Sequence, residues 1–451
     1  MKRVSFFAAF AFALAQTGAD GALTVTSTAP SRANDLSGAF IEKIWTVSGQ
    51  DGDVLDDIKV QVAGNVFVDY DASLRASDGG VAAKVVLRSS SPDMFDVVDV
   101  NIHEAEGSGF RVHYKNVNAR VVGEVVTQIT VSDPSVVSSV SAIHADGVVI
   151  GEGVVVTNAP TASLNLDCSS DADIFVGSPQ DQFVLKSIGI ASSGDGHVQF
   201  LASSIQADSV TISLSGDSKA VVAATGKISV DSMASSISSD GKIFIETADL
   251  QAQTLSATLS GDGKVSYSSA GACVNDMIHL SGDAAVYAGS IVCKNTIVKT
   301  SGDGKAIVQT TDTLTSVGGG SVKYVNAPPQ RIVSSSIFRK HSNVKPAKYN
   351  KVKTHRPSIP PTKAPTELTI VLKAAWFGDS PHVSDYSGIG NSIVIDGSGF
   401  ATNFAATDVP SYLHNIGPFD VLVAVGFVAA IAAVAYKIRE RQTREQYKPL
   451  V

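Results

Sequence analysis

The chain has 451 residues, of which 17% are charged, and its formal net charge is −8 at pH 7. This acidic balance argues against nucleic-acid binding, which needs a basic surface. The 38 glycines favour many short strands joined by tight turns over long helices.

Residues 1–15 have the pattern of a signal peptide. Lys2 and Arg3 give a positively charged start, an apolar stretch follows, and Ala13-Leu14-Ala15 matches the small-x-small pattern of a cleavage site. An uncleaved anchor is the alternative, but the apolar stretch is too short to span a bilayer. We therefore expect secretion, followed by an N-terminal lead-in over residues 16–44.

A motif similar to Ser-Gly-Asp-Gly-Lys recurs between residues 144 and 321. Subtracting the positions of its successive aspartates gives gaps of 25, 24, 22, 23, 22, 21 and 20 residues. A steady, slowly shortening period is typical of stacked structural repeats. The aspartates that mark the copies are Asp146, Asp171, Asp195, Asp217, Asp240, Asp262, Asp283 and Asp303.

The segments between these turns alternate apolar and polar residues, as in residues 209–214, which is the period of a strand with one buried face. About 20 residues hold two or three strands and cannot bury their apolar face alone, so neighbouring copies must stack. We expect an all-β fold, a parallel β-solenoid (β-helix) of about 20–25-residue rungs over residues 45–330. A helical solenoid lacks support because no 3.6-residue period is visible, and a β-sandwich would not space one turn motif so evenly.

These turns, closed by Gly320-Ser321-Val322-Lys323-Tyr324 and Asn326-Ala327-Pro328, resemble the head domain (GIN domain) of auto-transporter adhesins. The resemblance covers residues 140–330 well and extends loosely back to residue 45. It implies a surface location and an adhesin-like binding role. Members of that family are mostly bacterial surface or secreted proteins, whereas this chain has a C-terminal apolar segment with a basic tail.

The repeated aspartates have two interpretations. Gly and Asp form turns, since Gly supplies positive φ and Asp bonds the backbone two residues on. A ladder of carboxylates could also bind Ca²⁺, but calcium-binding β-rolls have shorter, glycine-richer repeats. Because Lys219, Lys242, Lys264 and Lys305 follow their aspartates by two residues and can neutralise them, we expect structural turns and no metal site.

No catalytic constellation is visible in the sequence. The close acid pairs are Asp56-Asp57 and Asp171/Asp173, and neither has a His or Arg beside it in the sequence. Ser193 and His197 lack a nucleophile elbow, and the histidines lack metal-ligand spacing. We expect a protein without catalytic activity or cofactor. The alternative is a β-helix carbohydrate-active enzyme acting on wall polysaccharide, in which Asp171 or Asp173 would be required.

The three cysteines are Cys168, Cys273 and Cys293. Cys273 and Cys293 are one rung apart, and adjacent strands lie about 4.8 Å from each other, within reach of a disulfide. The other interpretation is a ladder of buried thiols, towards which the sequence leans.

Residues 331–365 carry nine Lys or Arg and no acid, with five prolines, and predict an extended spacer. The spacer would be a solvated stalk or a contact for acidic wall polymers. Residues 366–417 return to short apolar stretches and are expected to form a membrane-proximal segment, with no further assignment.

Residues 419–436 are apolar except for Asp420 and would span roughly 27 Å as a helix. The Lys and Arg excess in residues 437–451 places that tail in the cytosol. We therefore expect a single-pass protein of the secretory route, at the plasma membrane, with its N-terminus outside. Its partners would be the membrane itself and glycans or surface proteins.

Overall fold

The computed structural model describes residues 23–33, 39–49, 54–78, 80–103, 108–335, 343–351, 355, 358–374, 382–388, 391–395 and 401–402. The expected signal peptide (1–15), transmembrane helix (419–436) and tail (437–451) lie outside these residues. Within the part of the chain that the structure describes, no helix is long and apolar enough to cross a membrane.

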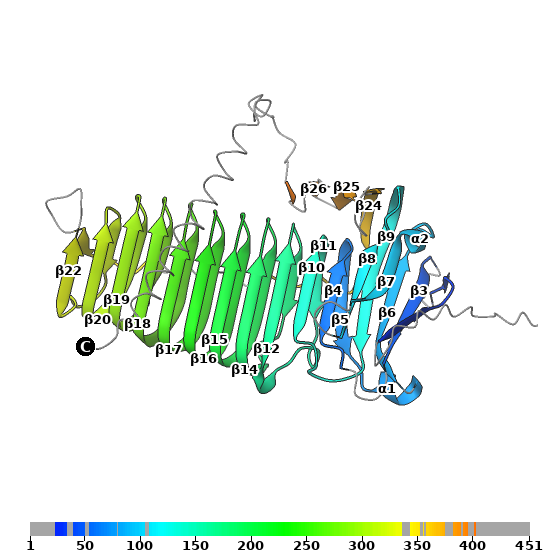
Figure 1. The fold of residues 1–451 in the computed structure, drawn as a ribbon, viewed down its shortest axis with the longest axis horizontal. Helices are drawn as coiled ribbons and strands as arrows, with labels where there is room; N and C mark the ends of the chain where they lie inside the picture. Colours follow the sequence, from blue (N-terminus) through cyan, green and yellow to red (C-terminus); the bar gives the residue numbers. More distant parts are fainter. Residues whose placement is uncertain are drawn as a thin grey trace, which may run out of the picture. The chain divides into compact units, whose positions relative to one another are not determined.

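The central part of the chain is a parallel β-solenoid (Figure 1), as the turn spacing predicted. Consecutive strands stack in parallel register, so that Val198, Ala220 and Ile243 are lateral neighbours in one row. The coil makes about nine turns with rungs of about 22 residues. Its main strands are β12 (Asn158–Ser169), β13 (Asp173–Val176), β14 (Gln182–Ser192), β15 (His197–Leu214), β16 (Lys219–Ile237), β17 (Lys242–Leu259), β18 (Lys264–Ser281), β19 (Ala285–Ser301), β20 (Lys305–Gly318) and β21 (Ser321–Tyr324).

The core lies inside the coil because successive side chains of a strand point to opposite faces. In β17, Ile243, Ile245 and Leu250 are fully buried, while Lys242 on the other face is exposed. Each inward row continues from rung to rung, and this stacking makes one continuous hydrophobic core.

The turn motifs stack along one edge of the coil. The residues two positions after successive aspartates are registered partners, as His197 with Lys219 and Lys242 with Lys264. Asp146 departs from this order because it lies in a bulge between Ala145 and Gly147.

At its N-terminal end the coil does not follow chain order. The rung of β4 (Asp57–Gln61) and β5 (Gly64–Tyr70) lies between the rung of β8 (Gly109–Tyr114) and β9 (Ala119–Val131) and that of β10 (Ser139–Ile143) and β11 (Ala145–Ile150). Antiparallel strands and two short helices adjoin this end. They are β1 (Thr24–Ser27), β2 (Ser31–Arg32), β3 (Ile41–Ser48), β6 (Val81–Ser89), β7 (Val98–His103), α1 (Ser73–Asp78) and α2 (Met94–Val97).

The chain after residue 330 does not leave the coil as a free spacer. β22 (Arg331–Ser335) pairs with β20, and β23 (Val344–Pro346) pairs with β21. Further on, β24 (Thr366–Lys373) pairs antiparallel with β9, at the opposite end of the coil. It is followed by β25 (His382–Gly388), β26 (Asn391–Ile395) and β27 (Ala401–Thr402).

The described residues between β22 and β24 (343–351, 355 and 358–365) are called the strap below. The expected stalk is thus replaced, in these residues, by a segment that contacts the coil from one end to the other. Asn343 begins it, with a 5% exposed side chain that donates to the carbonyls of Gly318 and Gly320 and accepts from Ser316 and Ser334. At the other end, Lys363 pairs with Asp69 at 2.6 Å.

Candidate binding groove

A groove of about 520 Å³ runs across the strands β14 to β18 on the outside of the coil. Its floor is a lateral row of short or medium apolar residues that includes Ala207, Val230 and Ala252. These residues keep 5–8% of their surface exposed, whereas the inward row of Val198, Ala220 and Ile243 is fully buried. The outside of the coil is therefore hollowed along this row.

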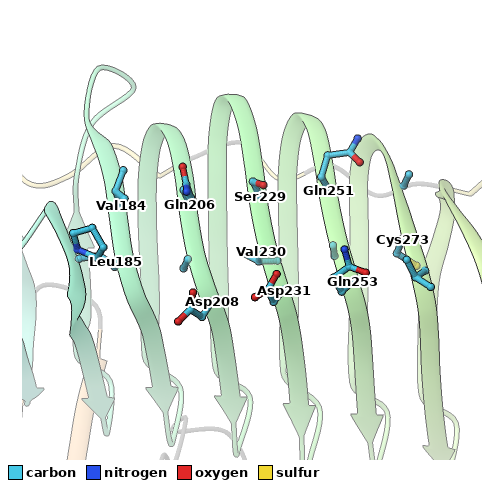
Figure 2. A pocket seen from close by; sticks show the side chains of 15 residues that line it. Val184, Leu185, Gln206, Asp208, Ser229, Val230, Asp231, Gln251, Gln253 and Cys273 are labelled. Carbon is cyan, nitrogen blue, oxygen red and sulfur yellow. The ribbon is translucent and has the colours of Figure 1, made fainter.

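Two rows of polar side chains border the floor (Figure 2). Because residues on either side of an inward position point outward, each rung contributes one side chain to each row. The first row holds Gln206, Ser229 and Gln251, and the second holds Asp208, Asp231 and Gln253. On β15 to β17, hydrogen-bonding groups therefore repeat at the strand spacing of about 4.8 Å. Val184 on β14 and Ala272 and Val274 on β18 occupy the same rows with apolar side chains.

The groove is acidic and has no aromatic lining. Asp208 and Asp231 occupy neighbouring rungs, since the residues that precede them, Ala207 and Val230, are registered partners. Like charges directly opposite on adjacent strands destabilise a sheet, and Lys186, the neighbour of Asp208 on the rung before, offsets part of this repulsion. Lys186 and Lys294 continue the same row outside the lining residues.

The turn aspartates lie elsewhere. The six from Asp195 to Asp303 are exposed in the turns, and none lines the groove. Asp240 accepts from the backbone N–H of Asp262 at 3.3 Å, which is a turn-stabilising contact between rungs. No group of three or more His, Cys, Asp or Glu residues suited to a metal ion occurs among the residues that the structure describes.

The acid pair Asp171/Asp173 lies on the face that the strap covers. Burial raises the pKa of Asp173 to about 7, and its carboxylate accepts the backbone N–H of His197 at 3.0 Å. Burial, followed by the charges of Lys219 and His355, lowers the pKa of His197 to about 4. Ser193 is exposed in the turn before this strand.

The pair Asp56-Asp57 has basic neighbours from its own strand and from others. Lys59, two residues on in β4, lies 3.5 Å from Asp57. Strand pairing places Arg111 beside Lys59 and brings β7 next to β8, and Lys59 also contacts His103 of β7. Asp57 is 7% exposed, and its Oδ1 has no hydrogen-bond partner among the described residues. The sequence reveals Lys59 beside this pair but not His103 or Arg111, which come from other strands.

Cys273 and Cys293 are joined by a disulfide between adjacent rungs, with their Cα atoms 4.4 Å apart. The sequence alone had not decided between a disulfide and a pair of buried thiols, and we had slightly favoured the thiols. Cys168 is buried as a free thiol, and burial raises its pKa to about 12. Its Sγ donates to the carbonyl of Ala172 at 2.6 Å, which indicates a packing role.

No protein-family model and no curated protein matches the chain. Solved structures of similar fold include a "putative adhesin" from Parabacteroides merdae, at 14% identity and a TM-score of 0.38, covering 64% of this chain and 96% of that one. A "putative adhesin" from Parabacteroides distasonis has 12% identity and a TM-score of 0.33, covering 70% and 96%. A "putative lipid binding protein" from the same species has 10% identity and a TM-score of 0.32, covering 65% and 93%. Likeness at this level carries no argument about function.

Proposed function

We propose that the protein is an adhesin-like surface protein that binds an extended neutral glycan in the groove, without catalysis. The observation that carries the proposal is the pair of polar rows, led by Gln206 and Asp208, on either side of a shallow floor. Amide, hydroxyl and carboxylate groups are the partners that sugar hydroxyls need, because a hydroxyl both donates and accepts. Their repeat at the strand spacing suits a polymer that lies across several rungs.

The charge of the groove narrows the ligand class. Asp208 and Asp231 would repel a polymer of uronic acids or sulfated sugars, since no Lys, Arg or His lines the groove. Recognition without aromatic stacking rests on hydrogen bonds, many of them to ordered water, so the affinity of a single site is expected to be modest. A repetitive ligand would compensate for this through several contacts at once.

A glycan array with the purified full-length chain tests the proposal. We expect binding to neutral polysaccharides that changes little with salt, together with a loss of about tenfold when Gln206 and Gln251 are both changed to Ala. Asp240→Ala, on an exposed turn outside the groove, is the matched control and should bind as the parent does. Binding only to acidic glycans, or equal binding by the double variant, would contradict the proposal.

A second candidate is carbohydrate cleavage, favoured by the contacts of Lys59 with Asp57 and His103. A carboxylate, an amine and an imidazole in contact provide the groups that acid–base catalysis uses. Depolymerase assays on pectins and glucans test it. Activity in the parent that disappears in Lys59→Met would favour this candidate, and loss in Asp173→Asn alone would locate the site under the strap instead.

Membrane anchoring through residues 419–436 is part of the proposal. It rests on the apolar segment and the basic tail of the sequence. A tag after Val451 should stay protected when protease is added to intact cells, and digestion of that tag from outside would refute the orientation.

A further inference from the structure

One outward row of the coil is apolar and buried. Phe175, Val221 and Ile307 point away from the core, because they alternate with core residues, yet they are only 6%, 0% and 2% exposed. Outward positions elsewhere on the coil, such as those of the groove rows, are exposed or half-buried. The row is continuous in register from rung to rung and consists of Phe175, Gln199, Val221, Phe244, Ser266, Tyr287 and Ile307.

The strap covers this row. Ala347 packs on the small cluster that contains Tyr287 and Ile307. The ring of His355 lies 5.0 Å from that of Phe244. Farther along, Pro361 lies beside the row rather than on it: a Cβ on Gly147, which is in register with Asp173 and His197, would be 2.9 Å from the proline Cγ. The strap therefore crosses the strands along the coil, and we call the covered row the channel.

The described contacts of the strap are spaced along the coil as an extended chain would space them. From the rung of Phe244 to that of Gly147 there are four steps between strands, or about 19 Å at about 4.8 Å each. From His355 to Pro361 there are six residues, which also span about 19 Å at the polyproline II rise of about 3.1 Å. The prolines of this segment favour that conformation and reduce the entropy lost on binding.

Two polar side chains bind the backbone of the strap, Gln199 in the channel and Glu246 in the row beside it. The amide of Gln199, 1% exposed, donates to the carbonyl of Ser358 at 3.0 Å and accepts its N–H at 2.7 Å. The carboxylate of Glu246 accepts the N–H of His355 at 2.5 Å. A side-chain amide that satisfies both groups of one residue imitates strand pairing, and it places no demand on the side chain of that residue.

We propose that the channel is a peptide-binding site for extended, proline-containing segments of other chains, and that the strap is its resident, displaceable occupant. Apolar contacts along the row would supply affinity, and Gln199 and Glu246 would fix the direction and register of the peptide. The partner class is an unfolded or surface-exposed polypeptide segment in polyproline II conformation, which distinguishes this site from the glycan groove on β14 to β18.

A labelled synthetic peptide of residues 343–362 is the probe, added to the full-length chain. Ser358→Pro in the chain removes the N–H that Gln199 accepts and keeps the extended conformation, so the strap should bind less tightly in that variant. We expect the peptide to bind this variant about tenfold more tightly than it binds the parent. Adding Gln199→Ala should then abolish the gain, whereas Gln206→Ala, on the same strand but in the groove, should keep it.

A second variant weakens the contact of the strap with the coil in a different way, in case Ser358→Pro misfolds. Lys363→Glu reverses the exposed ion pair with Asp69 and lies outside the probe peptide. Hydrogen exchange of residues 343–365 reports whether the strap has opened. Absence of peptide binding in both variants would overturn the proposal and make the strap a fixed part of the fold, as would binding that does not depend on Gln199. Glycan binding is unaffected by either result, so the two proposals fail separately.

Discussion

The glycines of the turn motif should hold the coil together more strongly than its aspartates do. Gly302 has φ of +126° and Gly261 has φ of +77°, in the region that β-branched residues avoid. A Cβ on Gly302 would also lie 2.8 Å from the carbonyl oxygen of Gly282 in the rung before. Gly302→Val thus combines backbone strain of about 1–3 kcal/mol with overpacking of about 1–3 kcal/mol.

The sum, roughly 2–6 kcal/mol, is a large part of the stability of an ordinary domain, about 5–15 kcal/mol. Gly319→Val is the matched control, because nothing lies within 4 Å of a Cβ there and its φ is not in the left-handed region. That variant should cost less than about 1 kcal/mol. Asp303→Asn changes an exposed side chain and should cost about 0–1 kcal/mol.

Thermal melts of the variants, with calcium and with chelator, measure the ranking. Because a long coil can unfold in parts, hydrogen exchange of residues 281–305 should accompany the melts. The reasoning fails if Asp303→Asn destabilises as much as Gly302→Val. It also fails if chelator lowers the melting temperature of the parent to that of the aspartate variant, since the aspartates would then be calcium ligands.

Three further predictions concern buried groups. Burial raises the pKa of Asp276 to about 7. Between about pH 4 and pH 7 the folded chain therefore keeps a proton on Asp276 that the unfolded chain has released, so the free energy of unfolding falls as the pH rises through this range. Asp276→Asn should be more stable than the parent by about 4 kcal/mol at pH 8 and no more stable near pH 4. Urea unfolding at both pH values measures this, and a stability difference that is the same at pH 4 and pH 8 would contradict the prediction. Asn343→Ala leaves two carbonyls without donors and should cost roughly 2–4 kcal/mol, with faster hydrogen exchange confined to β22 and the strap. Cys293→Ser removes a disulfide that closes a loop of 20 residues and should lower the free energy of unfolding by about 3 kcal/mol. Its melting temperature should equal that of the parent in reductant, and a parent whose melting temperature does not change with reductant would refute the prediction.

The coil was predictable because each of its turns has a recognisable sequence. The backbone geometry of the turn favours Gly and Asp, so a turn that recurs in every rung appears as a repeated motif in the sequence. The groove could not be found by extending this count. Asp208 follows Asp195 by 13 residues and Asp231 follows Asp217 by 14, and the two share a lateral row only because the register shifts by one residue between Ala202 and Ser204. What the spacing does not reveal is the hollow, which depends on the course of the backbone between the rows.

The position of the strap and the contacts of Lys59 could not be predicted, because they join residues that are far apart in the sequence. His103 lies 44 residues from Lys59 in sequence. The two meet because β8 pairs with both β4 and β7, which brings these strands into one sheet. Likewise, the basic, proline-containing composition of residues 331–365 predicts an extended chain but does not say what that chain lies against. That depends on the outward residues of rungs far away in the sequence.

Those outward residues explain why the row is covered in the folded chain. Apolar side chains at Val221 and Ile307 contribute nothing to the core inside the coil, and an uncovered row of them would form a long apolar patch. Such a row is stable in water only when something lies on it, and Gln199, buried among them, needs a backbone partner for both ends of its amide. The apolar row and its buried amide therefore require an extended polypeptide over them, whichever chain supplies it.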